Sequence, residues 1–191
     1  MLKTLHNWLS TPSSKMDFNT LLSQHYTRLY QLAYAWTHQT SVSEDLVQET
    51  LLKAIEHQHQ LNDLDQLLPW LCKILHNLYI DKMRYQQQWQ WMEEDAIDFQ
   101  HTQASCEDDY MKHEALTALE AAMTRLTDSQ RQIITLIDLQ ELSYQQTAEI
   151  LDIPVGTVMS RLSRARKELE KQLMLSNKQN KNNVIEMRQP S

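Results

Sequence analysis

Glycine and proline are scarce in this 191-residue chain, which has one glycine and four prolines. A fold that needs many tight turns is therefore excluded. Gly156 alone cannot build a phosphate-binding loop or a dinucleotide-binding fingerprint, because both need several glycines where the backbone approaches a phosphate. The sequence also lacks long apolar runs and the apolar centre of a signal peptide, so we expect a cytoplasmic chain without membrane insertion. Apolar residues recur at helical spacing instead, which predicts an all-α fold.

Metal-binding and catalytic patterns are also missing. Cys72 and Cys106 have no paired spacing for zinc, and we expect reduced thiols. Glu56 and His59 have the spacing of a helix-bundle di-iron site, but such a site needs a second copy, which the sequence does not contain. We therefore predict no catalytic residue, no metal and no cofactor, with surface positions for His57, His59, His76, His101 and His113.

Charge is distributed unevenly along the chain, whose net charge is −7. Residues 93–114 carry 8 acidic and 1 basic side chains, whereas residues 157–191 carry 3 acidic and 8 basic ones. We interpret residues 90–114 as a flexible acidic linker that joins two small helical domains. The base-rich C-terminal segment is the candidate for contact with a polyanion, because binding depends on the local field of one face.

Three helices are predicted in the first domain, residues 17–89. The first begins at an Asp17 cap and ends near residue 38, and the third extends from about Leu67 to Tyr85. The second begins at a capping box formed by Ser41 and Glu44, and its expected buried stripe contains Val47, Leu51 and Ile55. Another face of this second helix carries an exposed row, which is either a solvated surface or a docking surface, made of Asp45, Gln48, Glu49 and Leu52.

The second domain, residues 115–175, has clear helix boundaries. A helix over 115–126 is followed by capping boxes at Thr127 with Gln130 and at Ser143 with Gln146. The short helix 144–151, a turn and a helix from Val155 to about Leu173 form the pattern of a helix-turn-helix. Arginine, serine and threonine on the exposed face of the last helix can contact bases or phosphates in a major groove. The candidate residues are Thr157, Met159, Ser160, Arg161, Ser163, Arg164 and Lys167.

Two motifs in this order resemble a known family. The segments 142–144 and 153–162 are very similar to region 4 of bacterial sigma factors of the extracytoplasmic-function (ECF) group of the sigma-70 family. The segments 43–50 and 69–71, together with Asn77, Asp81 and Arg84, resemble region 2 of the same group. The resemblance covers about residues 17–88 and 115–173.

The resemblance implies a subunit that directs core RNA polymerase to promoters and initiates transcription, in response to a stress or envelope signal. By position, the exposed row of the second helix docks on the clamp coiled coil of polymerase, and region 4 lies on the flap. The last helix reads the minus-thirty-five element. The minus-ten element is bound by Asn62, Asp63, Trp70, Lys73, Asn77 and Arg84. Promoter DNA and an anti-sigma factor are the other expected partners.

One alternative function remains open from the sequence. A helix-turn-helix regulator that does not act as a sigma subunit would explain the second domain but not the first.

Two segments lie outside both domains. Residues 1–16 form an N-terminal extension, and residues 176–191, rich in asparagine and lysine, are predicted to be a disordered tail.

Overall fold

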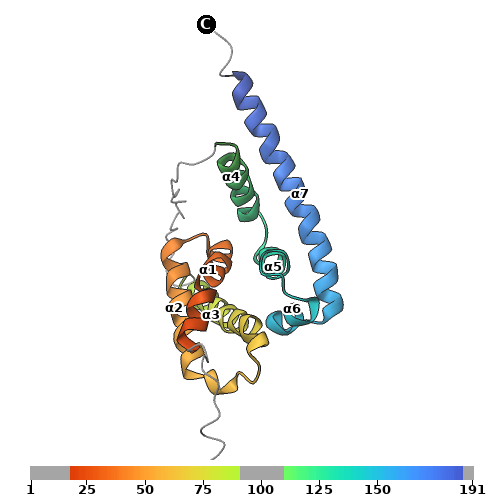
Figure 1. Cartoon of the computed structure of the whole chain (residues 1–191). Coiled ribbons are helices and arrows are strands. Elements are labelled where there is room, and N and C mark those ends of the chain that lie inside the picture. Colours follow the sequence, from red (N-terminus) through yellow and green to blue (C-terminus); the bar gives the residue numbers. More distant parts are fainter. Residues whose placement is uncertain (1–17, 91–109, 187–191) are drawn as a thin grey trace, which may run out of the picture.

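The computed structural model describes residues 18–90 and 110–186, which form helices without any strand in these two ranges (Figure 1). The N-terminal extension, residues 91–109 of the acidic linker and residues 187–191 lie outside the described residues, as does Cys106. No helix in the described ranges is long and apolar enough to span a bilayer. The predicted all-α fold is confirmed. The helices are α1 (Phe18–Thr37), α2 (Thr40–Glu56), η1 (Gln58–Gln60), η2 (Leu64–Gln66), α3 (Leu67–Gln90), α4 (Tyr110–Thr124), α5 (Asp128–Ile134), η3 (Thr135–Leu139), α6 (Tyr144–Leu151) and α7 (Val155–Glu186).

The first three α-helices form a bundle in which α2 packs against both α1 and α3. Its core contains Leu29, Leu32, Trp36, Leu71 and Leu75, all of them fully or almost fully buried. These residues recur at three- and four-residue spacing, so each helix presents one apolar face to the others. The bundle holds the α2 and α3 surfaces in a fixed relation to one another.

Two predictions for α2 were wrong. The helix begins at Thr40, one residue before the predicted cap Ser41, and its N-cap Gln39 makes no side-chain capping bond. The buried stripe contains Ser43, Leu46, Val47, Thr50 and Ala54, so the predicted stripe was right for Val47, whereas Leu51 is half-buried and Ile55 is 42% exposed. Small residues on this face let α2 approach its neighbours closely, which turns the bulkier Ile55 outward.

Helices α4 to α7 form the second unit. Helix α4 begins at Tyr110 and ends at Thr124, so the predicted bounds 115–126 were wrong and residues 110–114 of the predicted linker are helical. Both capping boxes are present, one at Thr127 and Gln130 and the other at Ser143 and Gln146. Helix α6 has the predicted bounds. The core of this unit comprises Leu126, Ile133, Ile134, Ala148, Val158, Leu162 and Ala165.

Helix α7 is longer than the sequence predicts. It continues to Glu186, so residues 176–186 are helical and the prediction of a disordered tail from residue 176 was wrong for them. The sequence contains no glycine or proline between Gly156 and Pro190 that would stop the helix. Composition alone therefore placed the end of the helix too early.

The two units share a hydrophobic core. Leu136, Leu142 and Ile150 of the second unit are buried in the same cluster as the core residues of α1 and α3. A π-turn at Thr135–Leu139 follows α5, and in it the Gln140 amide donates to the carbonyl oxygen of Thr135 at 3.0 Å. This widened turn brings Thr135, Leu136 and Gln140 into contact with the first unit.

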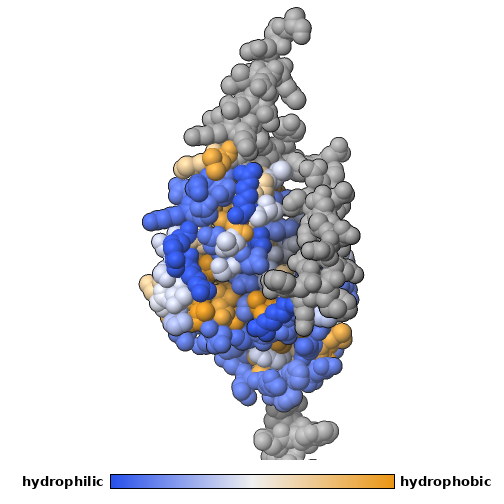
Figure 2. Space-filling model, turned by 180° about the vertical axis from the view of Figure 1, so that it is seen from behind, coloured by the Kyte–Doolittle hydropathy of each residue, from blue (hydrophilic) through white to orange (hydrophobic). Residues whose placement is uncertain are grey.

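The face seen from behind the view of Figure 1 is mostly hydrophilic, with apolar areas between the polar ones (Figure 2). Large exposed apolar side chains include Leu52 on α2, Tyr144 on α6 and Met159 on α7. Such residues, when they lie singly, need no special explanation, so the candidate interfaces depend on the arrangement of polar and charged groups.

Candidate nucleic-acid interface

Helices α6 and α7 are joined by a short turn that orients the candidate reading helix. Asp152 adopts a left-handed conformation with φ 53° and ψ 50°, which asparagine and aspartate tolerate better than most residues. The next amide, of Ile153, donates to the carbonyl oxygen of Ala148 at 3.1 Å. The carbonyl oxygen of Pro154 then accepts from Thr157 N at 2.8 Å, which starts α7. The chain reverses within three residues, as a helix-turn-helix requires.

The structure places the predicted reading residues on one side of α7. Val158, Leu162 and Ala165 are buried against α5 and α6, and the opposite side is exposed. Thr157 is half-buried, whereas Met159, Ser160, Arg161, Ser163, Arg164 and Lys167 are exposed. The reading face therefore consists of polar and basic side chains and one methionine, Met159, that no other described helix covers.

The two arginines of this face differ in their surroundings. Arg164 Nε donates to the carbonyl oxygen of Ser160 at 3.2 Å, so the guanidinium lies along its own helix. Arg161 makes no hydrogen bond or ion pair with the described residues and lines a cavity between the two units. Each guanidinium keeps donors available for a nucleic acid.

Three of the six residues predicted for the minus-ten element meet in this same cavity, whose volume is about 630 Å³. Lys73, Asn77 and Arg84 of α3 line one wall, and Leu151, Asp152 and Arg161 line the facing wall. Trp70 instead packs partly against the hydrophobic core. Asn62 and Asp63 are exposed in the loop before α3, where the Asp63 carboxylate accepts from Asp65 N at 3.0 Å.

The Lys73 side chain already has hydrogen-bond partners within the chain. Its ammonium donates to the carbonyl oxygens of Glu149 at 2.7 Å and Ile150 at 2.8 Å. These oxygens belong to the last turn of α6, where the carbonyls lack partners within their own helix and the helix dipole is negative. The ammonium therefore caps α6 in the second unit from its place on α3 in the first.

His57 and His59 are exposed, as predicted, whereas His76, also expected at the surface, is half-buried. Burial, with a smaller contribution from the Lys73 charge, lowers its pKa to about 4. Its ring stands edge-on to Trp36 with 6.0 Å between the ring centres, and its buried Nδ1 has no hydrogen-bond partner among the described residues. The imidazole is therefore neutral at physiological pH and packs as an aromatic side chain.

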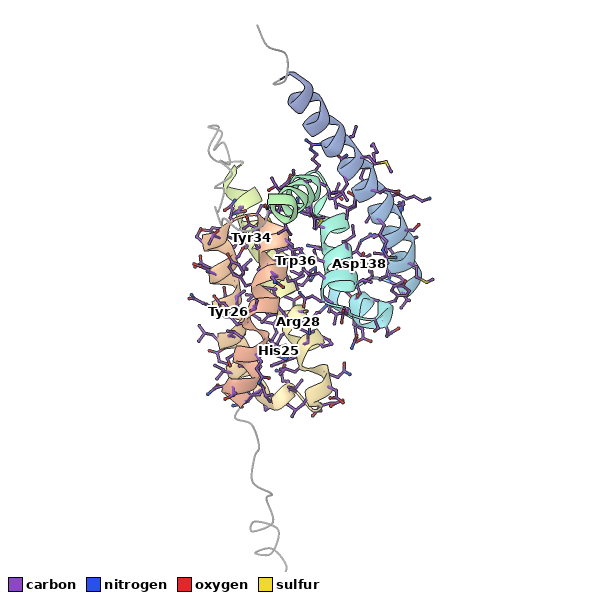
Figure 3. All side chains as sticks on the ribbon, turned by 45° about the horizontal axis from the view of Figure 1, so that its top comes forward. His25, Tyr26, Arg28, Tyr34, Trp36 and Asp138 are labelled. Carbon is purple, nitrogen blue, oxygen red and sulfur yellow. The ribbon has the colours of Figure 1, made fainter. Side chains whose placement is uncertain are left out.

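Three further hydrogen-bonded pairs cross between the units, and the sequence did not predict any of them. Gln146 Nε2 of α6 donates to Gln66 Oε1 of η2 at 3.4 Å. Arg28 donates from Nε to Gln140 Oε1 at 3.0 Å and from a terminal nitrogen to the Gln140 carbonyl at 2.8 Å, while Gln140 Nε2 donates to the Arg28 carbonyl at 3.1 Å. Trp36 Nε1 donates to Thr135 Oγ1 at 2.8 Å. Figure 3 shows Arg28 and Trp36 on the side of α1 that faces the segment carrying Asp138. The only sequence signals are single polar residues within apolar stretches, which do not identify their partners.

The exposed row of α2 is present as predicted. Asp45, Gln48, Glu49 and Leu52 are all exposed. Asp45 lies 3.7 Å from Lys82 Nζ of α3, and Glu49 lies 3.8 Å from Lys53 Nζ. Helix α2 packs on α1 and α3 and lies on the side of the molecule away from α6 and α7 (Figure 1). The row therefore remains accessible while the two units are in contact.

Comparisons with known proteins agree with this division into two units. The family model "Sigma-70 region 2" matches residues 21–89, and "Sigma-70, region 4" matches residues 116–169. The ECF RNA polymerase sigma factor SigW of Bacillus subtilis is 28% identical over 165 residues, which cover 82% of this chain and 88% of SigW. The ECF RNA polymerase sigma factor EcfG of Rhodopseudomonas palustris is 32% identical over 127 residues, covering 66% and 68% of the two chains.

A solved structure is similar over most of both chains. It is the sigma factor RpoE from Bartonella quintana in complex with the anti-sigma factor NepR, with a TM-score of 0.68 and 29% identity, and the match covers 83% of this chain and 97% of RpoE. The fold is also similar to that of CnrH in its complex with the cytosolic domain of CnrY, at a TM-score of 0.60 and 21% identity.

Proposed function

The chain belongs to the sigma-70 family of RNA polymerase sigma factors, in its ECF group, and from this premise we propose how its two regions divide the recognition of a promoter. Residues 21–89 are region 2 and residues 116–169 are region 4. The observation that carries the proposal is that both regions occur in order on one chain, each with an exposed polar surface suited to its task. The chain directs core RNA polymerase to specific promoters under a stress or envelope signal.

Region 4 reads the minus-thirty-five element with α7. Arginine can make a bidentate bond to guanine in the major groove, and serine or threonine can serve either a base or a phosphate. Arg164 lies on the same face as Thr157 and Ser160, which the hydrogen bonds along this helix connect. We assign base contact to Arg164 and backbone contact to Arg161 and Lys167.

Region 2 binds the unstacked strand of the minus-ten element with α3 and the loop before it. Asn77 offers both a donor and an acceptor to the edge of an extruded base, while Lys73 and Arg84 offer phosphate partners. Trp70 supports this face from its place against the core, and Asn62 and Asp63 contact the strand from the loop.

Polymerase and an anti-sigma factor are the proposed protein partners. The α2 row docks on the clamp coiled coil, because it is polar, exposed and held on the rigid three-helix bundle. Region 4 contacts the flap. The chemistry of RNA synthesis belongs to core polymerase, so this chain acts in the cytoplasm as a recognition subunit rather than as an enzyme.

The alternative, a helix-turn-helix regulator that does not act as a sigma subunit, accounts only for α4 to α7. It leaves the exposed row of α2 and the polar wall of α3 without a role. The two functions differ in one observation, because only a sigma subunit forms a stable complex with core polymerase and supports initiation from a defined promoter.

Runoff transcription tests the proposal. Purified chain is added to core polymerase on fragments of the source genome, and transcripts with defined start sites are expected only when the chain is present. Asn77→Ala should keep the fold and reduce permanganate reactivity of the melted strand, while Asn19→Ala on α1 removes the same chemical group elsewhere and should leave melting unchanged. A chain that yields no transcript from any fragment, or that binds no core polymerase, would refute the proposal.

A further inference from the structure

A groove of about 540 Å³ lies between the first turns of α1 and the last turns of α2. The two helices pack side by side (Figure 1). Leu22 and Tyr26 of α1 and Leu51 and Ile55 of α2 supply the apolar lining of the groove. Tyr26 and Ile55 are exposed although both are large and apolar. Apolar side chains gathered in one groove, unlike those scattered singly, indicate a surface that another segment covers.

The first nine residues of the chain have the sequence pattern of a short amphipathic helix. Leu2, Leu5 and Leu9 recur at helical spacing, and Met1 and Trp8 fall on the same side. The other four positions of residues 1–9 are polar. A helix of this length is not stable alone in water, so its apolar side requires a surface on which to pack.

We propose that residues 1–9 of the chain occupy the groove between α1 and α2. Their apolar side packs on Leu51 and Ile55, and the Trp8 indole lies against the Tyr26 ring. The proposal goes beyond the proposed function, because this contact lies within the chain and needs neither polymerase nor DNA.

The length of the chain before α1 and the place where α1 begins favour this occupant. Phe18 packs against the core of the first unit, and Asn19 already lines the groove. Residues 10–17, which connect the two parts, reach about 26 Å when extended. The groove wall from Asn19 to Thr27 is only about 12 Å long, and a nine-residue helix is about 13 Å long. A connection this short holds the segment at an effective concentration in the millimolar range, which favours it over a separate partner.

The charges of the two parts are complementary. Helix α2 is mostly acidic, and its charged residues are Glu44, Asp45, Glu49, Lys53 and Glu56. Residues 1–16 contain Lys3 and Lys15 and no acidic residue. Opposite charge therefore favours the approach of this part of the chain to α2 and fixes its orientation there.

Tyr26 gives the groove an aromatic wall in a fixed orientation. Its ring stacks on Tyr30, with 6.5 Å between the ring centres and 9° between the planes, and Tyr30 stacks on Tyr34 at 6.2 Å. Aromatic side chains prefer offset-stacked or edge-on contacts with one another. The one aromatic side chain of residues 1–9 is Trp8, so Tyr26 is its expected partner.

Backbone dynamics at Trp8 test the contact in the full chain. NMR order parameters are about 0.85 for a rigid backbone and below about 0.6 for a flexible one. We expect the rigid value at Trp8 in the wild type. Ile55→Asp places a carboxylate in the apolar groove, where burial under the segment would be costly, and should lower the value at Trp8 below about 0.6.

Leu52→Asp is the matched control, because it introduces the same carboxylate in place of an isomeric side chain at an exposed position outside the groove lining. It should leave the Trp8 order parameter unchanged. Order parameters along α1 and α2 establish that each variant keeps the bundle. A flexible Trp8 in the wild type, or a rigid Trp8 in a folded Ile55→Asp chain, would overturn the proposal.

Substitutions in the segment test the contact from the other side. Leu5→Ser combined with Trp8→Ser should shift the NMR methyl signals of Leu51 and Ile55, whereas Thr4→Ser combined with Asn7→Ser changes only polar positions and should leave these signals in place. Methyl signals that stay unchanged in the first pair would overturn the proposal, even if Ile55→Asp did not fold. Runoff transcription is scored separately, because its absence in a chain with a rigid Trp8 would refute the sigma function and leave this contact in place.

Discussion

The bond between Trp36 and Thr135 allows a sharp test of how region 4 is held on region 2. Thr135→Val replaces a hydroxyl by a methyl group of similar size, and therefore removes the oxygen that accepts from the buried indole N–H of Trp36. The indole cannot turn to another partner, because its ring lies against Tyr79 at 5.3 Å and His76 at 6.0 Å between ring centres. A buried donor left without a partner costs about 1–3 kcal/mol.

Thr50→Val provides the matched control. Thr50 is also fully buried, and its hydroxyl donates to the Leu46 carbonyl at 2.7 Å, as the Thr135 hydroxyl does to the Arg131 carbonyl at 2.8 Å. Both substitutions lose this local bond, but only Thr135→Val deprives a side chain of the other region of its acceptor. The difference between the two losses in the free energy of unfolding therefore isolates the indole bond, and we expect about 2 kcal/mol.

Urea denaturation followed by circular dichroism and by tryptophan fluorescence measures this difference. A loss of about 2 kcal/mol corresponds to roughly 4–8 °C in the melting temperature of a chain of this size. Adding Trp36→Phe, which removes the donor itself, should reduce the cost of Thr135→Val to about that of Thr50→Val, because only the local bond to the Arg131 carbonyl is then lost. Equal destabilisation by Thr135→Val and Thr50→Val would show that the indole does not depend on region 4, and the reasoning would fail.

Three other predictions concern the α2 row, the reading helix and a buried histidine. Charge reversal by Asp45→Lys or Glu49→Lys should abolish core binding in a pull-down without changing helical content, and wild-type binding by both variants would refute the docking assignment. Arg164→Ala should reduce the free energy of DNA binding by roughly 1–3 kcal/mol and relax specificity at one base pair, whereas Arg161→Ala should weaken binding to all sequences alike and lower the salt dependence of binding by about one unit. Binding to point-substituted promoters at several salt concentrations distinguishes the two roles. No effect from either substitution would show that α7 does not bind the groove. Since burial lowers the His76 pKa from 6.5 to about 4, the unfolded chain binds the additional proton between these values, so stability should fall as pH decreases from 6.5 toward 4. His76→Phe should remove this component from urea titrations at several pH values, and an unchanged slope would contradict the burial of His76.

Local sequence signals predicted the starts of α5, α6 and α7 well. The capping boxes at Thr127 and Ser143 depend only on residues within three positions, so the sequence specifies them directly. Ser41 failed as a cap because the preceding Thr40 is already helical, and Ser43 bonds to Gln39 O and Thr37 Oγ1 instead. Two adjacent hydroxyl residues offer alternative starting points, and tertiary packing decides between them.

Contacts between distant segments could not be predicted. Leu136, Leu142 and Ile150 have the apolar character expected of a helix-turn-helix core, yet they are buried against region 2. Apolar periodicity shows that a side chain is buried but does not identify which of two surfaces buries it. Likewise Lys73 and Asn77 were predicted as neighbours on one face of a helix, whereas the wall opposite them comes from residues more than 70 positions later. Such a site depends on how the two units meet.

The accessible position of the α2 row has a kinetic consequence for any partner that binds it. Since α2 lies away from α6 and α7, a partner can reach the row while regions 2 and 4 remain packed together. Binding at the row is then a second-order step whose rate increases with the concentration of the partner. This rate does not depend on the hydrogen bonds between regions 2 and 4, because those bonds can stay in place while the row is occupied.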